Sequence, residues 1–262
     1  MRLDRELEAA RRAGRPIVVA YVLVDRARRA SLARWASALR AGGASALELG
    51  FPFSDPIADG PVLEAAHERA LRDGTRWSDL LDALRTTAAV LPTAVMTYAN
   101  PLVRRGLDRA VGELSAAGAT GLIVPDLSLE ESAEFRRVAR RHRVALVLLA
   151  APGIPTERVA RIAKATRGFL YLVGQYGTTG GPARGSTVDL SPLVRAARRA
   201  SPRLPILYGF GVRDRGTATR ALESGADGVI VGTALERRLA HGESPQALRR
   251  FLASIAGAPR RS

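Results

Sequence analysis

Short apolar segments alternate with amphipathic segments along the whole chain, and this alternation limits the folds open to it. Each apolar segment has the length of a strand, and helical spacing of apolar residues follows it. Strand-then-helix repetition predicts a parallel sheet, because the helix carries the chain back to the edge where the next strand starts. Eight strands fit a closed α/β barrel, the (β/α)8 or TIM barrel, better than an open sheet. The predicted strands are 17–24, 46–51, 93–98, 121–125, 145–151, 169–174, 205–210 and 228–232.

Length and composition favour one barrel domain over residues 1–262. The chain has 262 residues, 47% of them hydrophobic, and no linker or change of composition divides it. Residues 1–16 form a charged amphipathic pattern, which predicts an extra N-terminal helix. This segment lacks the apolar centre of a secretory signal. No uncharged apolar run reaches the roughly 18 residues that would span a membrane. We therefore expect a cytoplasmic protein that has no membrane partner.

The chain is strongly basic, with a net charge of +15. Such a charge favours anionic ligands and could attract nucleic acid. The arginines are scattered over predicted outer helix faces, however, and no aromatic stacking platform accompanies them. We therefore expect no nucleic-acid partner. The absence of cysteine excludes disulfides, thiolate nucleophiles and zinc–thiolate sites.

Two carboxylates flank a loop rich in glycine and proline. Glu48 lies in the apolar run ALELGF, where a carboxylate is costly unless it is paired or needed for chemistry. Asp59 lies in the loop that leaves this predicted strand, directly before Gly60 and Pro61, which would open a helix. The two predict a general acid/base at a strand end with a second polar group beside it. The pattern alone leaves an alternative open, in which Glu48 faces water and Asp59 caps the helix.

Glycines follow the last three predicted strands. In a barrel the carboxyl ends of all strands meet at one face, so these glycines would converge although they are distant in sequence. Glycine lets backbone N–H groups approach an anion, and a helix N-terminus adds a favourable dipole. We predict a phosphate site there, and tight turns are the alternative explanation. The substrate- and phosphate-binding candidates are Thr179, Gly180, Gly209, Phe210, Gly211, Gly232 and Thr233.

Other chemistries of phosphate-binding barrels lack the residues they need. A Schiff-base aldolase needs a lysine at a strand end, and the single lysine, Lys164, lies on a predicted outer helix. A metal-dependent aldolase needs clustered ligands, whereas His67, His142 and His241 lie in helical or helix-end stretches without ligand spacing. We expect these histidines at the surface and predict no metal site. Carboxylate acid/base chemistry remains.

The segment ELGFPFSDPIADGPV, residues 48–62, resembles the most diagnostic stretch of the tryptophan synthase alpha subunit family. Shorter motifs follow in the family's order, so that the resemblance covers essentially the whole chain. The long first motif is highly specific, whereas the short glycine motifs alone would be weak. The further motifs are MTYANP (96–101), PDLSLEES (125–132), FLYL (169–172), GTTG (177–180), YGFGV (208–212) and VGTA (231–234).

The resemblance implies a carbon–carbon lyase of tryptophan biosynthesis. Such proteins cleave indole-3-glycerol phosphate to indole and glyceraldehyde 3-phosphate by a retro-aldol step, and their matching Glu and Asp are the catalytic pair. Glu48 would then protonate the indole ring carbon, and Asp59 would accept a hydrogen bond from the indole N–H. Tyr171 is a third catalytic candidate, with core packing as its alternative. Apolar walls for the indole are expected from Tyr21, Leu122, Leu127 and Phe210.

The resemblance also implies a partner. The alpha chain itself should need no cofactor, and pyridoxal phosphate would belong to a beta subunit in an alpha2beta2 heterotetramer. The first strand region, VVAYVLVDR, departs from the family's usual Thr and Gly-Asp-Pro-like turn, in a loop that helps to face the partner. Two alternatives therefore stay open: a stand-alone indole-releasing lyase of specialised metabolism, and a ligand-binding subunit that activates a beta partner. The intact Glu48 and Asp59 argue against the second.

Overall fold

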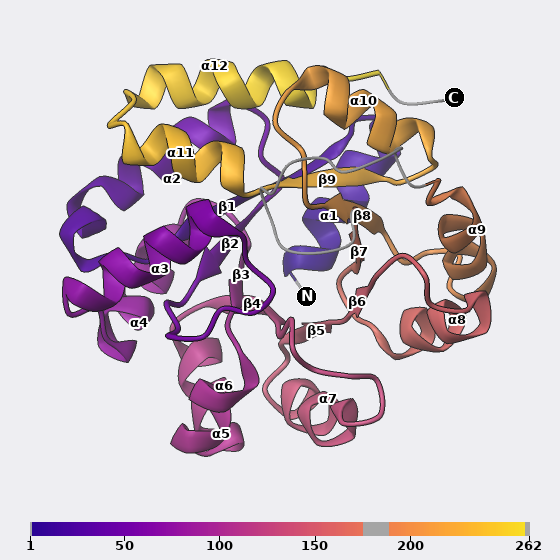
Figure 1. The fold of residues 1–262 in the computed structure, drawn as a ribbon, viewed down its shortest axis with the longest axis horizontal. Coiled ribbons are helices and arrows are strands. Elements are labelled where there is room, and N and C mark those ends of the chain that lie inside the picture. Colours follow the sequence, from indigo (N-terminus) through magenta and orange to yellow (C-terminus); the bar gives the residue numbers. More distant parts are fainter. Residues whose placement is uncertain (1, 175–188, 260–262) are drawn as a thin grey trace.

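The strands form one all-parallel sheet that curls into a barrel, as the alternating pattern predicts (Figure 1). The computed structural model describes residues 2–174 and 189–259. Neighbouring strands follow the order β5-β4-β3-β2-β1-β9-β8-β7-β6, and every pairing is parallel. The strands are β1 (Ile17–Leu23), β2 (Ala46–Gly50), β3 (Thr93–Met96), β4 (Ala119–Ile123), β5 (Ala145–Val147), β6 (Leu149–Ala150), β7 (Leu170–Val173), β8 (Ile206–Gly209) and β9 (Gly228–Val231).

The fifth predicted strand, 145–151, is split in two at Leu148. Its first part, β5, pairs with β4, and its second part, β6, pairs with β7. The main-chain carbonyl of Leu148 accepts the N–H of Tyr171 at 3.2 Å, so the chain changes its pairing neighbour at this residue. β5 and β6 are the two ends of the strand order and belong to one continuous segment, which nearly closes the barrel. The nine observed strands therefore correspond to the eight predicted ones, with the fifth counted twice.

Helices surround the strands on the outside of the barrel (Figure 1). Within the described ranges, no helix is long and apolar enough to cross a membrane. The helical elements are α1 (Arg2–Arg12), η1 (Arg26–Ser31), α2 (Leu32–Ala41), α3 (Pro61–Arg72), α4 (Trp77–Ala88), α5 (Ala99–Arg105), α6 (Leu107–Ala116), α7 (Ser132–Arg141), α8 (Thr156–Ala165), α9 (Ser191–Ala200), α10 (Arg215–Glu223), α11 (Thr233–Ala240) and α12 (Pro245–Ala256).

Side chains of each strand alternate between two separate apolar cores. In β1, Val19 and Tyr21 belong to the cluster inside the barrel, whereas Val18 and Ala20 belong to the cluster between barrel and helices. This division follows from the period of two along a strand, which sends successive side chains to opposite faces. Because both faces are buried, the strands read as continuous apolar runs rather than as alternating ones.

The predicted extra N-terminal helix, α1, packs against the inside cluster. Leu3, Leu7 and Ala10 share one face of the helix and are buried with the barrel interior. Leu3 reaches between two strands, since its Cδ2 lies 3.2 Å from the position that a Cβ would take on Gly121 and on Gly168. A side chain at either glycine would crowd Leu3, which would have to move by a few tenths of an ångström. The helix thus covers the end of the barrel opposite the strands' carboxyl ends.

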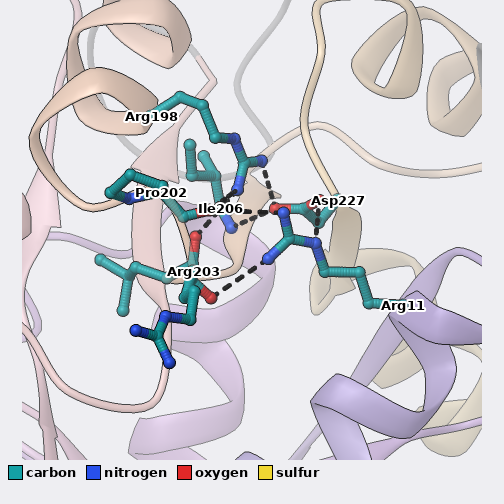
Figure 2. Close-up of polar contacts among 7 residues, drawn as sticks. Arg11, Arg198, Pro202, Arg203, Ile206 and Asp227 are labelled. Atoms are coloured by element: carbon teal, nitrogen blue, oxygen red, sulfur yellow. Dashed lines mark hydrogen bonds and ion pairs between the residues drawn. The ribbon is translucent and has the colours of Figure 1, made fainter.

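A buried aspartate ties α1 to the barrel (Figure 2). Asp227 lies just before β9 and is 1% exposed, between Arg11 of α1 and Arg198 of α9. Its Oδ2 accepts a hydrogen bond from the N–H of Ile206 at 2.9 Å and from Nη2 of Arg198 at 2.5 Å. Arg11 Nε lies 3.5 Å from Oδ1. One carboxylate therefore links two helices and the start of a strand.

Replacing Asp227 by alanine is expected to lower the free energy of unfolding by about 2–3 kcal/mol, because a buried N–H and two arginines lose their acceptor. The arginine side chains are 32% and 29% exposed, which keeps the loss at the lower end. Urea unfolding measures it. The control is Glu8→Ala, whose ion pair with Arg12 is exposed and should contribute less than about 0.5 kcal/mol. Equal effects of the two substitutions would contradict this role of Asp227.

Candidate active site

The alternation of β2 directs Glu48 into the barrel. Ala46 belongs to the inside cluster and Leu47 and Leu49 to the outer one, so Glu48 shares the inward face with Ala46. Its side chain is fully buried. The edge-strand alternative, with Glu48 in water, is therefore wrong.

Glu48 is held in an environment that favours its protonated form. Neither carboxyl oxygen of Glu48 has a hydrogen-bond partner among the residues that the structure describes. Burial, together with the nearby charge of Asp59, raises the pKa of Glu48 from 4.5 to about 8. At neutral pH the side chain therefore carries a proton that it can donate.

Asp59 is buried in the loop between β2 and α3, with one oxygen engaged and one unpartnered. Its Oδ2 accepts a hydrogen bond from the hydroxyl of Tyr98 at 2.9 Å, and that hydroxyl in turn accepts the N–H of Ala58 at 3.1 Å. Its Oδ1 has no partner among the described residues. Asp59 does not cap α3, since the N-cap of that helix is Gly60. A donor that enters the barrel would therefore find Oδ1 ready to accept.

His67 is a member of this site that sequence reasoning missed. We expected it at the surface, but its side chain is 4% exposed, so that expectation is wrong. It lies on the buried face of α3, the face of Leu63, Ala66 and Ala70. Its Nε2 lies 3.3 Å from Oδ2 of Asp59. The spacing of these apolar residues around position 67 was the signal that would have revealed its burial.

Tyr171 faces the barrel interior from β7, close enough to Glu48 and Asp59 for their charges to act on its hydroxyl. Burial raises the pKa of its hydroxyl, and the charges of Glu48 and Asp59 raise it further. The ring lies against Gly209, where a Cβ would come within 2.3 Å of its Cε1 atom. Phe210 packs against it edge-on, with ring centroids 5.9 Å apart. In this structure Gly209 and Phe210 thus position Tyr171.

A Gly209→Ala substitution is expected to displace Tyr171, because a methyl group would overlap the ring. We expect it to lower the free energy of unfolding by about 1–3 kcal/mol and to lower turnover by at least tenfold. Thermal unfolding and steady-state kinetics measure the two effects. Gly216→Ala on α10 is the control, since Gly216 has no positive φ and its added Cβ would meet its nearest atoms at an ordinary 3.5 Å. Full activity of Gly209→Ala would show that the ring position is not critical.

The glycines predicted to bind phosphate lie at the ends of two neighbouring strands, β8 and β9. Gly211 has a φ of +87°, which glycine adopts without strain, whereas Phe210 has a φ of +72°, which is rare for a bulky residue. Gly232 is the N-cap of α11, and Thr233 opens that helix. The first N–H groups of a helix have no intrahelical acceptor and can bind an anion. Thr179 and Gly180 lie outside the described residues.

Two of the four predicted apolar wall residues do not face the barrel interior. Leu122 belongs to the outer cluster, and its neighbour Ile123 faces inward instead. Leu127 also packs against the outer cluster. Predicting Leu122 as a wall residue was wrong by one position along β4, and a shift of one residue exchanges the two faces of a strand. Tyr21 and Phe210 do lie with the inside cluster.

The described residues contain no group of three or more histidine, aspartate or glutamate side chains that could hold a metal ion. His142 and His241 lie at the C-terminal ends of α7 and α11, as C-caps, and Lys164 lies on α8. The polar groups that converge inside the barrel are therefore those of Glu48, Asp59 and their neighbours.

A parallel (β/α)8 barrel with a protonated, buried glutamic acid and a second buried carboxylate is typical of enzymes that use general acid/base catalysis. A family model described as tryptophan synthase alpha chain matches residues 7–257. The chain belongs to the tryptophan synthase alpha chain family. This membership confirms the predicted carbon–carbon lyase of tryptophan biosynthesis, the alpha subunit activity.

Individual relatives agree with this membership. The alpha chain of Synechococcus sp. strain CC9902 is 41% identical over 237 residues, which cover 89% of this chain and 87% of that protein. The alpha chain of Arabidopsis thaliana is 37% identical and covers 89% of this chain and 85% of that protein. A structure of Mycobacterium tuberculosis tryptophan synthase has a TM-score of 0.88 and 35% identity, over 100% of this chain and 99% of that one.

Proposed function

We propose that this chain cleaves indole-3-glycerol phosphate to indole and glyceraldehyde 3-phosphate by a retro-aldol step, with Glu48 as the general acid. The observation that carries this proposal is the complete burial of Glu48 inside the barrel, where neither carboxyl oxygen has a partner among the described residues. Burial and the nearby charge of Asp59 raise its pKa to about 8. A protonated carboxyl group at neutral pH is what a reaction needs when its leaving group is a carbon atom. The family membership supports the same reaction.

Protonation of the indole ring carbon that carries the glycerol chain makes indole a leaving group. Glu48 donates its proton to this carbon and becomes a carboxylate. As the carbon–carbon bond breaks, its electron pair returns to the ring, and the hydroxyl group next to the ring becomes the aldehyde. Glu48 then takes the proton of this hydroxyl, which restores the starting form of the enzyme. One side chain thus serves as acid and base in turn.

Asp59 stabilises the positive charge that develops on the protonated indole. Its Oδ1 has no partner among the described residues and can accept the indole N–H, whereas Oδ2 is held by Tyr98. Tyr171 lies close enough to both carboxylates for their charges to act on it, so its hydroxyl is in place to contact Glu48 or the substrate. These contacts would orient the substrate for the proton transfers.

The phosphate group of the substrate would bind at the N-terminus of α11. The first N–H groups of this helix, which starts at Thr233 after Gly232, supply donors and a favourable dipole. Gly211 follows the neighbouring strand β8 and allows a close backbone approach. Gly209 and Phe210 would contribute by holding Tyr171. Thr179 and Gly180, which lie outside the described residues, complete the proposed set.

We further infer that the chain works in the cytoplasm with a tryptophan synthase beta subunit, as an alpha2beta2 assembly. The beta subunit would carry the pyridoxal phosphate that consumes indole, and this chain would need no cofactor of its own. Among the described residues, two of the three large apolar side chains with high exposure, Ile57 and Val103, follow the carboxyl ends of adjacent strands. Exposed apolar residues on the active-site face support a docking surface there.

The test is turnover of indole-3-glycerol phosphate by the purified chain, followed as release of glyceraldehyde 3-phosphate with and without a beta subunit. Turnover that increases with the beta subunit would support both the reaction and the partner. Turnover that the beta subunit leaves unchanged would favour a stand-alone lyase. Absence of turnover under both conditions would contradict the enzymatic proposal and leave the ligand-binding subunit.

A further inference from the structure

His67 forms the end of a chain of polar contacts that leads from the backbone to Asp59. The N–H of Phe53 donates a hydrogen bond to Nδ1 of His67 at 3.0 Å. The other ring nitrogen, Nε2, lies 3.3 Å from Oδ2 of Asp59. Both side chains are almost completely buried, with exposures of 4% and 1%. The ring therefore bridges the loop after β2 and the carboxylate that this loop carries.

The hydrogen bond from Phe53 fixes which ring nitrogen carries the proton. A nitrogen that accepts a hydrogen bond has no proton of its own, so the proton of the neutral ring is on Nε2. This N–H lies on the side that faces Asp59, although it is not aligned well enough for a hydrogen bond. The contact is therefore an attraction between the N–H dipole and the carboxylate charge.

Tyr98 and His67 act on the same oxygen of Asp59 from two different elements. Tyr98, the N-cap of α5, donates its hydroxyl proton to Oδ2, and His67 approaches Oδ2 from α3. Oδ1 is left without a partner among the described residues. Two contacts on one oxygen restrict rotation of the carboxylate, and they direct the other oxygen toward whatever occupies the barrel.

We propose that His67 is a positioning residue of the lyase reaction: with Tyr98 it holds Oδ2 of Asp59, so that Oδ1 meets the indole N–H. This inference rests on the proposed function of Asp59. His67 does not touch the substrate. Its Nδ1 side stabilises the loop through Phe53, and its Nε2 side orients the catalytic carboxylate, so the two ring nitrogens have separable effects.

Two substitutions separate these effects. The amide group of asparagine ends near the position of Nδ1, and that of glutamine extends to the position of Nε2. His67→Asn should keep the acceptor for Phe53 but lose the contact with Asp59, so kcat should fall by about tenfold or more with KM within about twofold. His67→Gln should keep kcat within about threefold but lower Tm by about 2–4 °C, because the N–H of Phe53 loses its acceptor.

His142 offers a matched control, since its Nε2 also lies 3.3 Å from an aspartate oxygen, that of Asp108, on the outside of the barrel. His142→Asn and His142→Gln should leave kcat and KM unchanged. Equal kcat for His67→Asn and the unaltered chain would overturn the proposal. Equal losses of kcat in His67→Asn and His67→Gln would also overturn the proposal. If His67 had only a structural role, the two variants should not differ in kcat.

A measurement without turnover separates this inference from the proposed reaction. The nitrogen-15 chemical shifts of the His67 ring, recorded on the full chain at about pH 8.5, report which nitrogen of the neutral ring is protonated. We expect the proton on Nε2, and a proton on Nδ1 would overturn the inference whether or not the chain is active. Failure of the unaltered chain to cleave indole-3-glycerol phosphate would instead contradict the proposed function alone.

Discussion

Glu48→Gln is expected to lower kcat for cleavage of indole-3-glycerol phosphate by about 10³-fold, with KM within about threefold of the unaltered chain. Glutamine has nearly the same shape as a protonated glutamic acid, but its amide cannot transfer a proton to carbon. Since Glu48 is proposed to act as acid and then as base, the substitution removes both steps. Stopped assays of glyceraldehyde 3-phosphate release measure the loss.

Glu48→Asp serves as the matched comparison. It keeps an ionisable carboxyl group but withdraws it by one methylene group, and a displacement of about 1 Å can cost about 10²-fold in rate. The Glu48→Asp variant should therefore lose less kcat than Glu48→Gln, although it changes the packing around position 48 more. A Gln variant with more than a tenth of the original kcat would exclude Glu48 as the proton donor. Tm of the Gln variant near neutral pH should be no lower than that of the unaltered chain.

Strand positions were predictable from the sequence because both faces of each strand are buried. Runs such as 17–24 and 228–232 contain only aliphatic or aromatic residues and glycine, so the predicted and observed strands differ by at most two residues at their ends. The same uniformity hides which face of a strand points inward. That is why Leu122 was assigned to the barrel interior, where the structure has Ile123. A continuous apolar run carries no alternation from which to infer the inward face.

The catalytic pair was predictable for a different reason. Glu48 is a charged residue in an apolar strand, and such an exception indicates either a functional group or an error in the strand assignment. The contact of Tyr98 with Asp59 was not predictable, because it joins residues 39 positions apart in the chain. The contact of His67 with Asp59 is local, but it depends on how α3 folds back on the loop that precedes it. The packing of Tyr171 on Gly209 likewise joins neighbouring strands that lie far apart in sequence.

Stability should depend on pH through Glu48 in a direction opposite to that of most carboxylates. The pKa of Glu48 is about 8 in the folded chain and 4.5 in its ordinary, solvated state. Between these values the folded chain holds one proton more than the unfolded chain. The free energy of unfolding therefore falls as pH rises through this window, by up to about 1.4 kcal/mol per pH unit from this group. It should level off above the folded pKa.

The difference between the unaltered chain and Glu48→Gln isolates this contribution, because every other titrating group is shared. Urea unfolding measures the free energy of unfolding of both chains between about pH 5 and pH 8.5. The value for Glu48→Gln minus the value for the unaltered chain should increase over this range by an amount on the order of a few kcal/mol. Parallel curves for the two chains would mean that Glu48 titrates alike in the folded and unfolded states. It would then be ionised at neutral pH, and the barrel would hold no proton to donate to indole.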